Sequence, residues 1–91
     1  MSTFKLIVSS PDGDKFNGEA VMLKVRGAEG DLAVMAGHIP FITSVMPCEC
    51  KIELADGTKK TGQTEGGILT VTAEKTTLLS ATFKFNEDNK D

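Results

Sequence analysis

The sequence predicts an all-β protein, an antiparallel β-sandwich of about ten short strands with no substantial helix. Apolar and polar residues alternate with a period of two through most of the chain, which is typical of strands with one buried face. Nowhere do apolar residues recur at the three- and four-residue spacing of an amphipathic helix over three turns. Turn-forming residues, among them nine glycines and three prolines, separate the alternating segments at short intervals. This spacing favours two packed sheets around one core.

The alternation begins at the amino terminus. Phe4, Leu6 and Val8 share one face of the first predicted strand, and the sequence Ser-Pro-Asp-Gly-Asp then interrupts it. The strands predicted for this half of the chain are residues 3–9, a brief piece at 16–18, 20–26, 31–35 and 41–46, with turns at 10–14, 27–30 and 36–40.

The clearest alternation follows Pro47, which cannot donate a ladder hydrogen bond and therefore separates two strands. Residues 48–54 place Cys48, Cys50, Ile52 and Leu54 on one face and charged residues on the other. The pair Asp56-Gly57 best suits a two-residue hairpin turn. We therefore expect residues 58–64 to return beside residues 48–54.

The last third of the chain completes the pattern. Gly66-Gly67 permits a bend or bulge before a strand at 68–73. Residues 76–85 are predicted as one strand, with Leu79, Ala81, Phe83 and Phe85 on one side and Leu78 on the other. We expect residues 1–85 to form one sandwich domain and residues 86–91, which are all polar, to form a fraying tail.

Size and charge exclude several classes of function. A chain of 91 residues holds one core, and a net charge of −3 with a pI near 5.1 argues against nucleic-acid binding. Tryptophan and tyrosine, which stack on bases, are absent. No apolar run approaches the roughly 20 residues of a membrane span, and the first residues do not resemble a secretory signal. We therefore expect the protein to stay in the cytosol.

Cys48, Cys50 and His38 are the candidates for thiol or metal chemistry. A cysteine nucleophile needs a base and an orienting group, whereas cysteines on an inward face are usually inert. A structural zinc site needs four ligands, and its paired cysteines commonly have wider spacing. The Cys-x-Cys spacing on a strand also disfavours a disulfide. We expect no catalytic residue, no metal and no cofactor, with a small thiol metal-binding or redox protein as the alternative.

The stretch 27–40 concentrates glycines, acids and the only histidine. A phosphate-binding loop would need a helix directly after Gly27 and Gly30, or after Gly66 and Gly67, and the sequence predicts no helix at either place. Glu29 and Asp31 on a glycine-bounded turn are expected to be solvated. The stretch therefore indicates an exposed, stiff loop suited to docking, whether in an assembly or in a free-standing adaptor.

Several segments together carry a family resemblance. They are Phe16-x-Gly18, Glu29-Gly30-Asp31-Leu32-Ala33, Ala36-Gly37-His38-Ile39-Pro40-Phe41-Ile42-Thr43, Gly66-Gly67-Ile68-Leu69-Thr70-Val71 and Thr77-Leu78-Leu79. With these segments the chain resembles the epsilon subunit of F-type ATP synthase, called delta in mitochondria, over residues 3 to about 85. The Gly-His-x-Pro element in register with the upstream Glu-Gly-Asp is the most specific part.

The resemblance implies a ten-stranded sandwich in the central stalk, with no catalysis of its own. It implies packing against the gamma subunit and the c-subunit ring, in a complex whose alpha and beta subunits carry the ATP chemistry. Such a subunit couples ion-driven rotation to ATP synthesis at the cytoplasmic face of the membrane, bound only through the complex. Most bacterial members continue into an inhibitory helical hairpin, whereas this sequence stops at Asp91. Inhibition through such a hairpin is therefore not expected.

The resemblance also assigns roles to single positions. Ala28, Glu29, Gly30 and Asp31 would face the polar loops of the c-ring, and Ser10 and His38 would lie against or near gamma. The residues expected to shape the loops are Gly27, Gly37, Pro40, Gly66 and Gly67. Pro47-Cys48-Glu49-Cys50 departs from the family pattern, in which Pro-Gly and β-branched residues are commoner.

Overall fold

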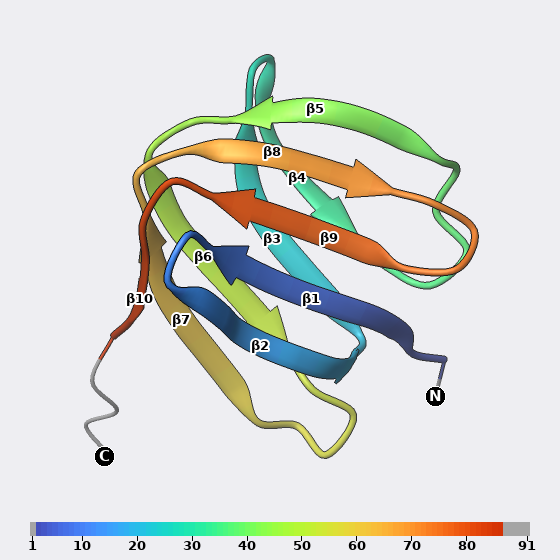
Figure 1. Cartoon of the computed structure of the whole chain (residues 1–91). Coiled ribbons are helices and arrows are strands. Elements are labelled where there is room, and N and C mark those ends of the chain that lie inside the picture. The colour runs from blue at the N-terminus through green and yellow to red at the C-terminus, as the bar shows by residue number, and fades with distance from the viewer. Residues whose placement is uncertain (1, 87–91) are drawn as a thin grey trace.

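A computed structural model describes residues 2–86 of the chain (Figure 1). This range contains ten strands and no helix, so the predicted fold class is confirmed. The strands are β1 (Phe4–Ser10), β2 (Gly13–Ala20), β3 (Met22–Gly27), β4 (Gly30–Val34), β5 (Phe41–Val45), β6 (Cys48–Glu53), β7 (Lys59–Thr64), β8 (Gly67–Val71), β9 (Thr76–Ser80) and β10 (Phe83–Phe85).

The strands form one hydrogen-bonded sheet that folds back on itself. Its order is β10-β7-β6-β3-β5-β8-β9-β1-β2, with β4 paired to the other edge of β3. β3 and β5 are joined only by the pair Gly27 and Val45, so the sheet folds there into two layers. One layer contains β4, β3, β6, β7 and β10, and the other contains β5, β8, β9, β1 and β2, as Figure 1 shows. The result is the predicted sandwich.

One strand pair departs from the antiparallel prediction. β1 and β9 run parallel, with pairs from Leu6 and Thr76 to Ser9 and Leu79, while the other pairings are antiparallel. The alternation of apolar residues shows which face of a strand is buried, but it carries no information on direction. Because β1 and β9 lie near opposite ends of the chain, no tight hairpin fixes their relative direction.

The prediction of a single strand at 76–85 is wrong in its extent, so Leu79 and Phe83, placed on one side of it, do not share a face. The segment consists of β9, which pairs with β8, and β10, which pairs with β7 in the other layer. The chain crosses between the layers at residues 81–82, which interrupts the alternation. Leu78 is therefore fully buried and Leu79 is 53% exposed, while Phe83 returns to the core.

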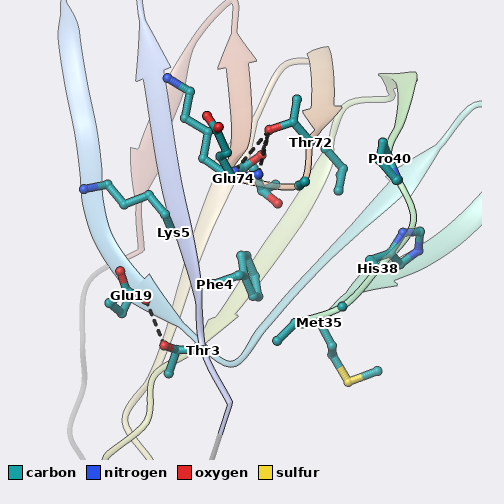
Figure 2. Close-up of a pocket in the computed structure, with 15 residues that line it drawn as sticks. Thr3, Phe4, Lys5, Glu19, Met35, His38, Pro40, Thr72 and Glu74 are labelled. Atoms are coloured by element: carbon teal, nitrogen blue, oxygen red, sulfur yellow. Dashed lines mark hydrogen bonds between the residues drawn. The ribbon is translucent and has the colours of Figure 1, made fainter.

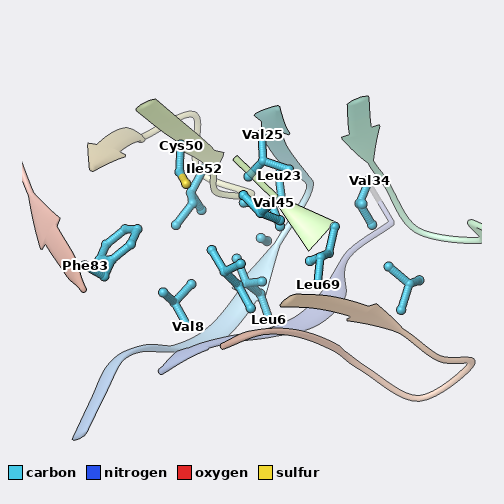
Figure 3. Packing of buried hydrophobic residues seen from close by; sticks show 13 residues of the cluster. Leu6, Val8, Leu23, Val25, Val34, Val45, Cys50, Ile52, Leu69 and Phe83 are labelled. Carbon is cyan, nitrogen blue, oxygen red and sulfur yellow. The ribbon is translucent and has the colours of Figure 1, made fainter. Parts of the chain in front are cut away.

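The core lies between the two layers (Figure 3). The shared faces predicted for the first strand and for residues 48–54 point inward, since Leu6, Val8, Cys50 and Ile52 are buried. Each large aliphatic side chain removed from water contributes about 1.5–3 kcal/mol. The buried apolar residues are Leu6, Val8, Ala20, Leu23, Val25, Val34, Val45, Cys50, Ile52, Leu69, Val71, Leu78 and Phe83.

The hairpin between β6 and β7 is one residue longer than predicted. Leu54 N donates to Thr58 O at 2.9 Å, which encloses three residues, 55–57. Gly57 has a φ of 91°, a left-handed conformation typical of three-residue loops. Thr58 N donates to Asp56 Oδ1 at 2.9 Å. This backbone hydrogen bond is the main cause that holds the pKa of Asp56 below its usual value.

Asn86 belongs to the folded sandwich, although the sequence predicted a tail from residue 86. Its backbone N donates to Thr61 O at 2.9 Å. Its side-chain Nδ2 donates to Glu49 Oε2 at 3.1 Å and to Thr61 Oγ1 at 3.0 Å. The prediction of a fraying tail otherwise concerns residues 87–91, which lie outside the described residues.

Candidate docking surfaces

The structure divides the stretch 27–40 into two separate loops. β4 lies between them as five extended residues, which span about 16 Å at the rise of a strand. The β3–β4 hairpin projects beyond β5, and the loop at residues 36–40 lies at the other end of β4 (Figure 1). The strand predicted at 31–35 is thus confirmed as β4, and the docking prediction for residues 27–40 applies to two separate loops.

The tip of the β3–β4 hairpin carries the residues assigned to the c-ring. Gly27 pairs with Gly30, so Ala28 and Glu29 form the turn, and Gly30 has a φ of 121°. Arg26 Nε donates to Asp31 Oδ1 at 3.0 Å. Within residues 2–86, Glu29 makes no ion pair. The free negative charge at this tip is therefore the Glu29 carboxylate.

The loop at residues 36–40 is ordered by local contacts around His38. His38 N donates to Met35 O at 3.1 Å, and the ring nitrogen Nδ1 lies 2.8 Å from Ile39 O. The His38 ring also lies 4.9 Å from the ring of Phe41. Gly37 adopts a φ of 85°, and Pro40 is exposed before β5 begins. The loop therefore presents Ile39, which is 74% exposed, on a stiff backbone.

An open hollow of about 510 Å³ lies beside this loop (Figure 2). Phe4 and Met35 line it together with His38, and so do charged residues, including Lys5 and Glu74. Neither cysteine lines it. The hollow therefore brings no thiol to His38, which the alternative thiol function would require.

The outer face of β5, β8 and β9 carries no charged side chain, and that of β1 carries only Lys5, near its amino end. We call this surface the apolar face. Ile42 is 71% exposed, Leu79 is 53% exposed and Ile68 is 44% exposed. On each strand the outward residues alternate with buried ones. The outward residues of neighbouring strands pair with each other and form two rows across the face. The rows are Ser44, Ile68, Leu79 and Ser9, and Ile42, Thr70, Thr77 and Ile7. Such a face leaves apolar area in water that a partner could cover.

Ser10 and His38 lie at opposite margins of the apolar face. Ser10 and Leu79 line one shallow hollow at the end of β1. His38 contacts Phe41, which precedes Ile42 in β5. The two residues assigned to gamma are therefore far apart from each other, but the same face connects them.

The outer face of the other layer has the opposite character. β3 carries Lys24 and Arg26, and β6 carries Glu49, Lys51 and Glu53. These side chains alternate with buried residues and point to solvent. The charge of this face contrasts with the apolar face, whose layer carries its charged side chains at Lys5 and along β2.

The two cysteines differ in their surroundings. Cys50 is fully buried, and this burial is the main cause that raises the pKa of its thiol from 9.0 to about 12. Cys48 is half-buried, and its Sγ accepts a hydrogen bond from Arg26 N at 3.4 Å. In the part of the chain that the structure describes, no three His, Cys, Asp or Glu side chains gather in a group that could hold a metal ion. The alternative thiol or metal function therefore gains no support.

Burial of Cys50 makes the domain less stable at alkaline pH. Between pH 9.0 and about 12 the unfolded chain loses this proton while the folded chain retains it, so the free energy of unfolding falls as pH rises. We expect wild-type protein to lose about 1.4 kcal/mol per pH unit relative to Cys50→Ala in this window. Urea unfolding of both proteins from about pH 8 to about pH 10.5 measures it. If the free energies of unfolding of the two proteins changed with pH in parallel, the raised pKa of the Cys50 thiol would be contradicted.

The alternation of apolar and polar residues in the sequence did not reveal the apolar face. Its signal is a set of adjacent apolar pairs, one member inward and one outward, as in Phe41-Ile42, Ile68-Leu69 and Leu78-Leu79. Gly27 and Gly67, expected to shape loops, lie at strand ends, and Gly66 precedes β8 with a φ of 110°.

Comparisons with known proteins agree with the resemblance. Residues 3–86 match the family model described as "ATP synthase, Delta/Epsilon chain, beta-sandwich domain". The ATP synthase epsilon chain, sodium ion specific, of Acetobacterium woodii is 35% identical over 86 residues, which cover 94% of this chain and 65% of that protein. The chain thus spans about two thirds of the length of this relative.

Two solved structures share the fold. A chain of the mitochondrial ATP synthase of Euglena gracilis, in a structure of OSCP, F1 and c-ring, superposes with a TM-score of 0.87 at 18% identity, covering 93% of this chain and 54% of that chain. A chain of the central stalk and c-ring of the Tetrahymena thermophila mitochondrial ATP synthase gives a TM-score of 0.76 at 13% identity. The superposition covers 91% of this chain and 66% of that chain. No helix in residues 2–86 could cross a membrane. With its family model matched over residues 3–86, the chain belongs to the family of the beta-sandwich domain of the ATP synthase delta/epsilon chain.

Proposed function

We propose that this chain acts as the sandwich of a non-catalytic central-stalk subunit of F-type ATP synthase. In this role it joins the gamma subunit to the c-subunit ring, so that ion-driven rotation of the ring reaches the catalytic alpha and beta subunits. It belongs to the cytoplasmic face of the membrane through the complex alone. The apolar face is the observation that carries the proposal, together with membership of the family.

The apolar face is the surface that we assign to gamma. Ile42, Ile68 and Leu79 expose apolar area in the middle of the face, while serine and threonine surround them. An interface core is depleted of charge and enriched in apolar side chains, so this face suits a permanent partner better than the charged face does. Ser10 and His38 at its two margins would then lie at the edge of the contact, as the resemblance implies.

The tip of the β3–β4 hairpin is the surface that we assign to the ring. It projects from the sandwich, and Glu29 offers a free carboxylate to basic ring loops. Asp31 already pairs with Arg26, so it holds the hairpin rather than supplying a free charge. Transmission of torque between the two surfaces requires stiffness, which the closely packed core between them supplies.

Co-purification with gamma and with the c-ring tests both assignments. Ile68→Glu places an unpaired charge in the apolar face, and we expect it to weaken binding of gamma by about 100-fold or more. Glu29→Lys removes the free charge of the tip, and we expect it to weaken binding of the ring while gamma still binds. Both variants should unfold at nearly the wild-type urea concentration, since both positions are exposed.

Two variants serve as matched controls. Gln63→Glu adds the same charge to the outer face of β7 in the charged layer, and Glu74→Lys makes the same charge change in the β8–β9 turn. Gln63→Glu should leave gamma binding unchanged, and Glu74→Lys should leave ring binding unchanged. Undiminished gamma binding by Ile68→Glu would reject the apolar face as the gamma surface.

A further inference from the structure

Two lysines stand directly opposite each other on the outer face of the charged layer. Lys24 of β3 and Lys51 of β6 are paired in the register of these antiparallel strands, and both are exposed. Like charges at such positions destabilise a sheet, because the two side chains are neighbours on one face. The free domain therefore carries an unfavourable pair in the middle of a sheet.

Two acids of this face already have hydrogen-bond partners, and the third, Glu53, stands opposite Lys59 rather than either of these lysines. Asp31 accepts the hydrogen bond from Arg26 Nε, and Glu49 accepts one from Asn86 Nδ2 at 3.1 Å. Across the described residues, 2–86, neither Lys24 nor Lys51 forms an ion pair. An additional carboxylate placed between their ammonium groups would therefore relieve their repulsion.

The surface is hollowed where such a group would lie. An open hollow of about 360 Å³ is lined by the cations Lys24, Arg26 and Lys51 and by the acids Asp31 and Glu49, with Val25, Pro47 and Cys48 adding less polar wall. We call it the lysine hollow. Because Asp31 is paired with Arg26, the charges left on the wall are those of Lys24 and Lys51 against Glu49. The net charge of the wall is therefore positive, which favours an anionic side chain as the occupant.

We propose that the lysine hollow receives a carboxylate side chain from an acidic segment of a partner protein. Arg26 and Asp31 belong both to this hollow and to the base of the β3–β4 hairpin, so a partner at the hairpin can continue along β3 into it. The net charge of −3 disfavours nucleic acid as the occupant. This inference does not depend on which protein contacts the hairpin.

The double variant Lys24→Gln/Lys51→Gln tests the hollow in the free chain. Because it removes the repulsion, we expect its melting temperature to rise by about 1–4 °C. Lys59→Gln is the matched control on the same face. Because Lys59 stands opposite Glu53 rather than another lysine, its replacement should not raise the melting temperature. A double variant no more stable than wild type would overturn the argument from repulsion.

Binding is measured with a hexaglutamate peptide at low salt, followed by the backbone amide NMR shifts of Lys24, Cys48 and Lys51. We expect saturable shifts in wild type and at least a tenfold weaker affinity in the double variant, with Lys59→Gln unchanged. Ile68→Glu should bind the peptide like wild type, which separates this site from the apolar face. Equal binding by the double variant, or the same shifts at the same concentration of inorganic phosphate, would overturn the proposal.

Discussion

Gly67→Ala is expected to destabilise the domain by about 3 kcal/mol or more, a large share of the stability of a chain of this size. A Cβ at position 67 would lie 1.9 Å from Leu79 O and 2.9 Å from Ser80 Cα. Both atoms belong to the backbone of β9, which pairs with β8 at this point. Only separation of the two strands can relieve the overlap. Urea unfolding with a fixed m-value measures the loss.

Gly18→Ala is the matched control for this substitution. Gly18 also lies inside a strand, and its added Cβ would meet only the ring of Phe16, at 3.5 Å. Its φ is not in the left-handed region. We therefore expect Gly18→Ala to unfold close to the wild-type midpoint. If the two alanine variants were equally stable, the close approach of β8 and β9 at Gly67 would be refuted.

Leu78→Ala and Leu79→Ala are expected to differ sharply although the residues are adjacent. Leu78 is fully buried between the layers, so its truncation should cost about 2–5 kcal/mol. Leu79 belongs to the apolar face, so its truncation should change the free energy of unfolding by no more than about 0.5 kcal/mol. Thermal or urea unfolding of the two variants in parallel measures the difference.

The variants Leu78→Ala and Leu79→Ala also distinguish an effect on folding from an effect on docking. Leu79→Ala should retain the fold yet bind gamma more weakly, whereas Leu78→Ala should lose stability first. The opposite order of stabilities would contradict the burial of Leu78 and the exposure of Leu79.

The alternation in the sequence predicts most of the fold because burial in a sandwich follows the period of a strand. Leu23 and Val25, or Cys50 and Ile52, report their inward face without any knowledge of their neighbours. The parallel pairing of β1 with β9 leaves no such signal, since side-chain periodicity is the same in either direction. The crossing after Ser80 was missed because Ala81 and Phe83 continue the alternation in the sequence while the chain changes layers.

The docking surfaces were predictable only in part. The hairpin tip and His38 stand out by residue type, and the strand predicted at 31–35 already separates them, as β4 does in the structure. The apolar face combines residues from four strands, so it exists only once β5, β8, β9 and β1 are side by side. The lysine hollow likewise depends on the register of β3 with β6, which sets Lys24 opposite Lys51.

The position of β1 between β2 and β9 also has a consequence for synthesis of the chain. The first strand leaves the ribosome with its hairpin partner β2, but its second neighbour is among the last strands to be made. Such long-range pairing slows folding, because a large loop must close before the contact forms. The layer that carries the apolar face is therefore completed late, and until then the edge of β1 needs protection from premature association.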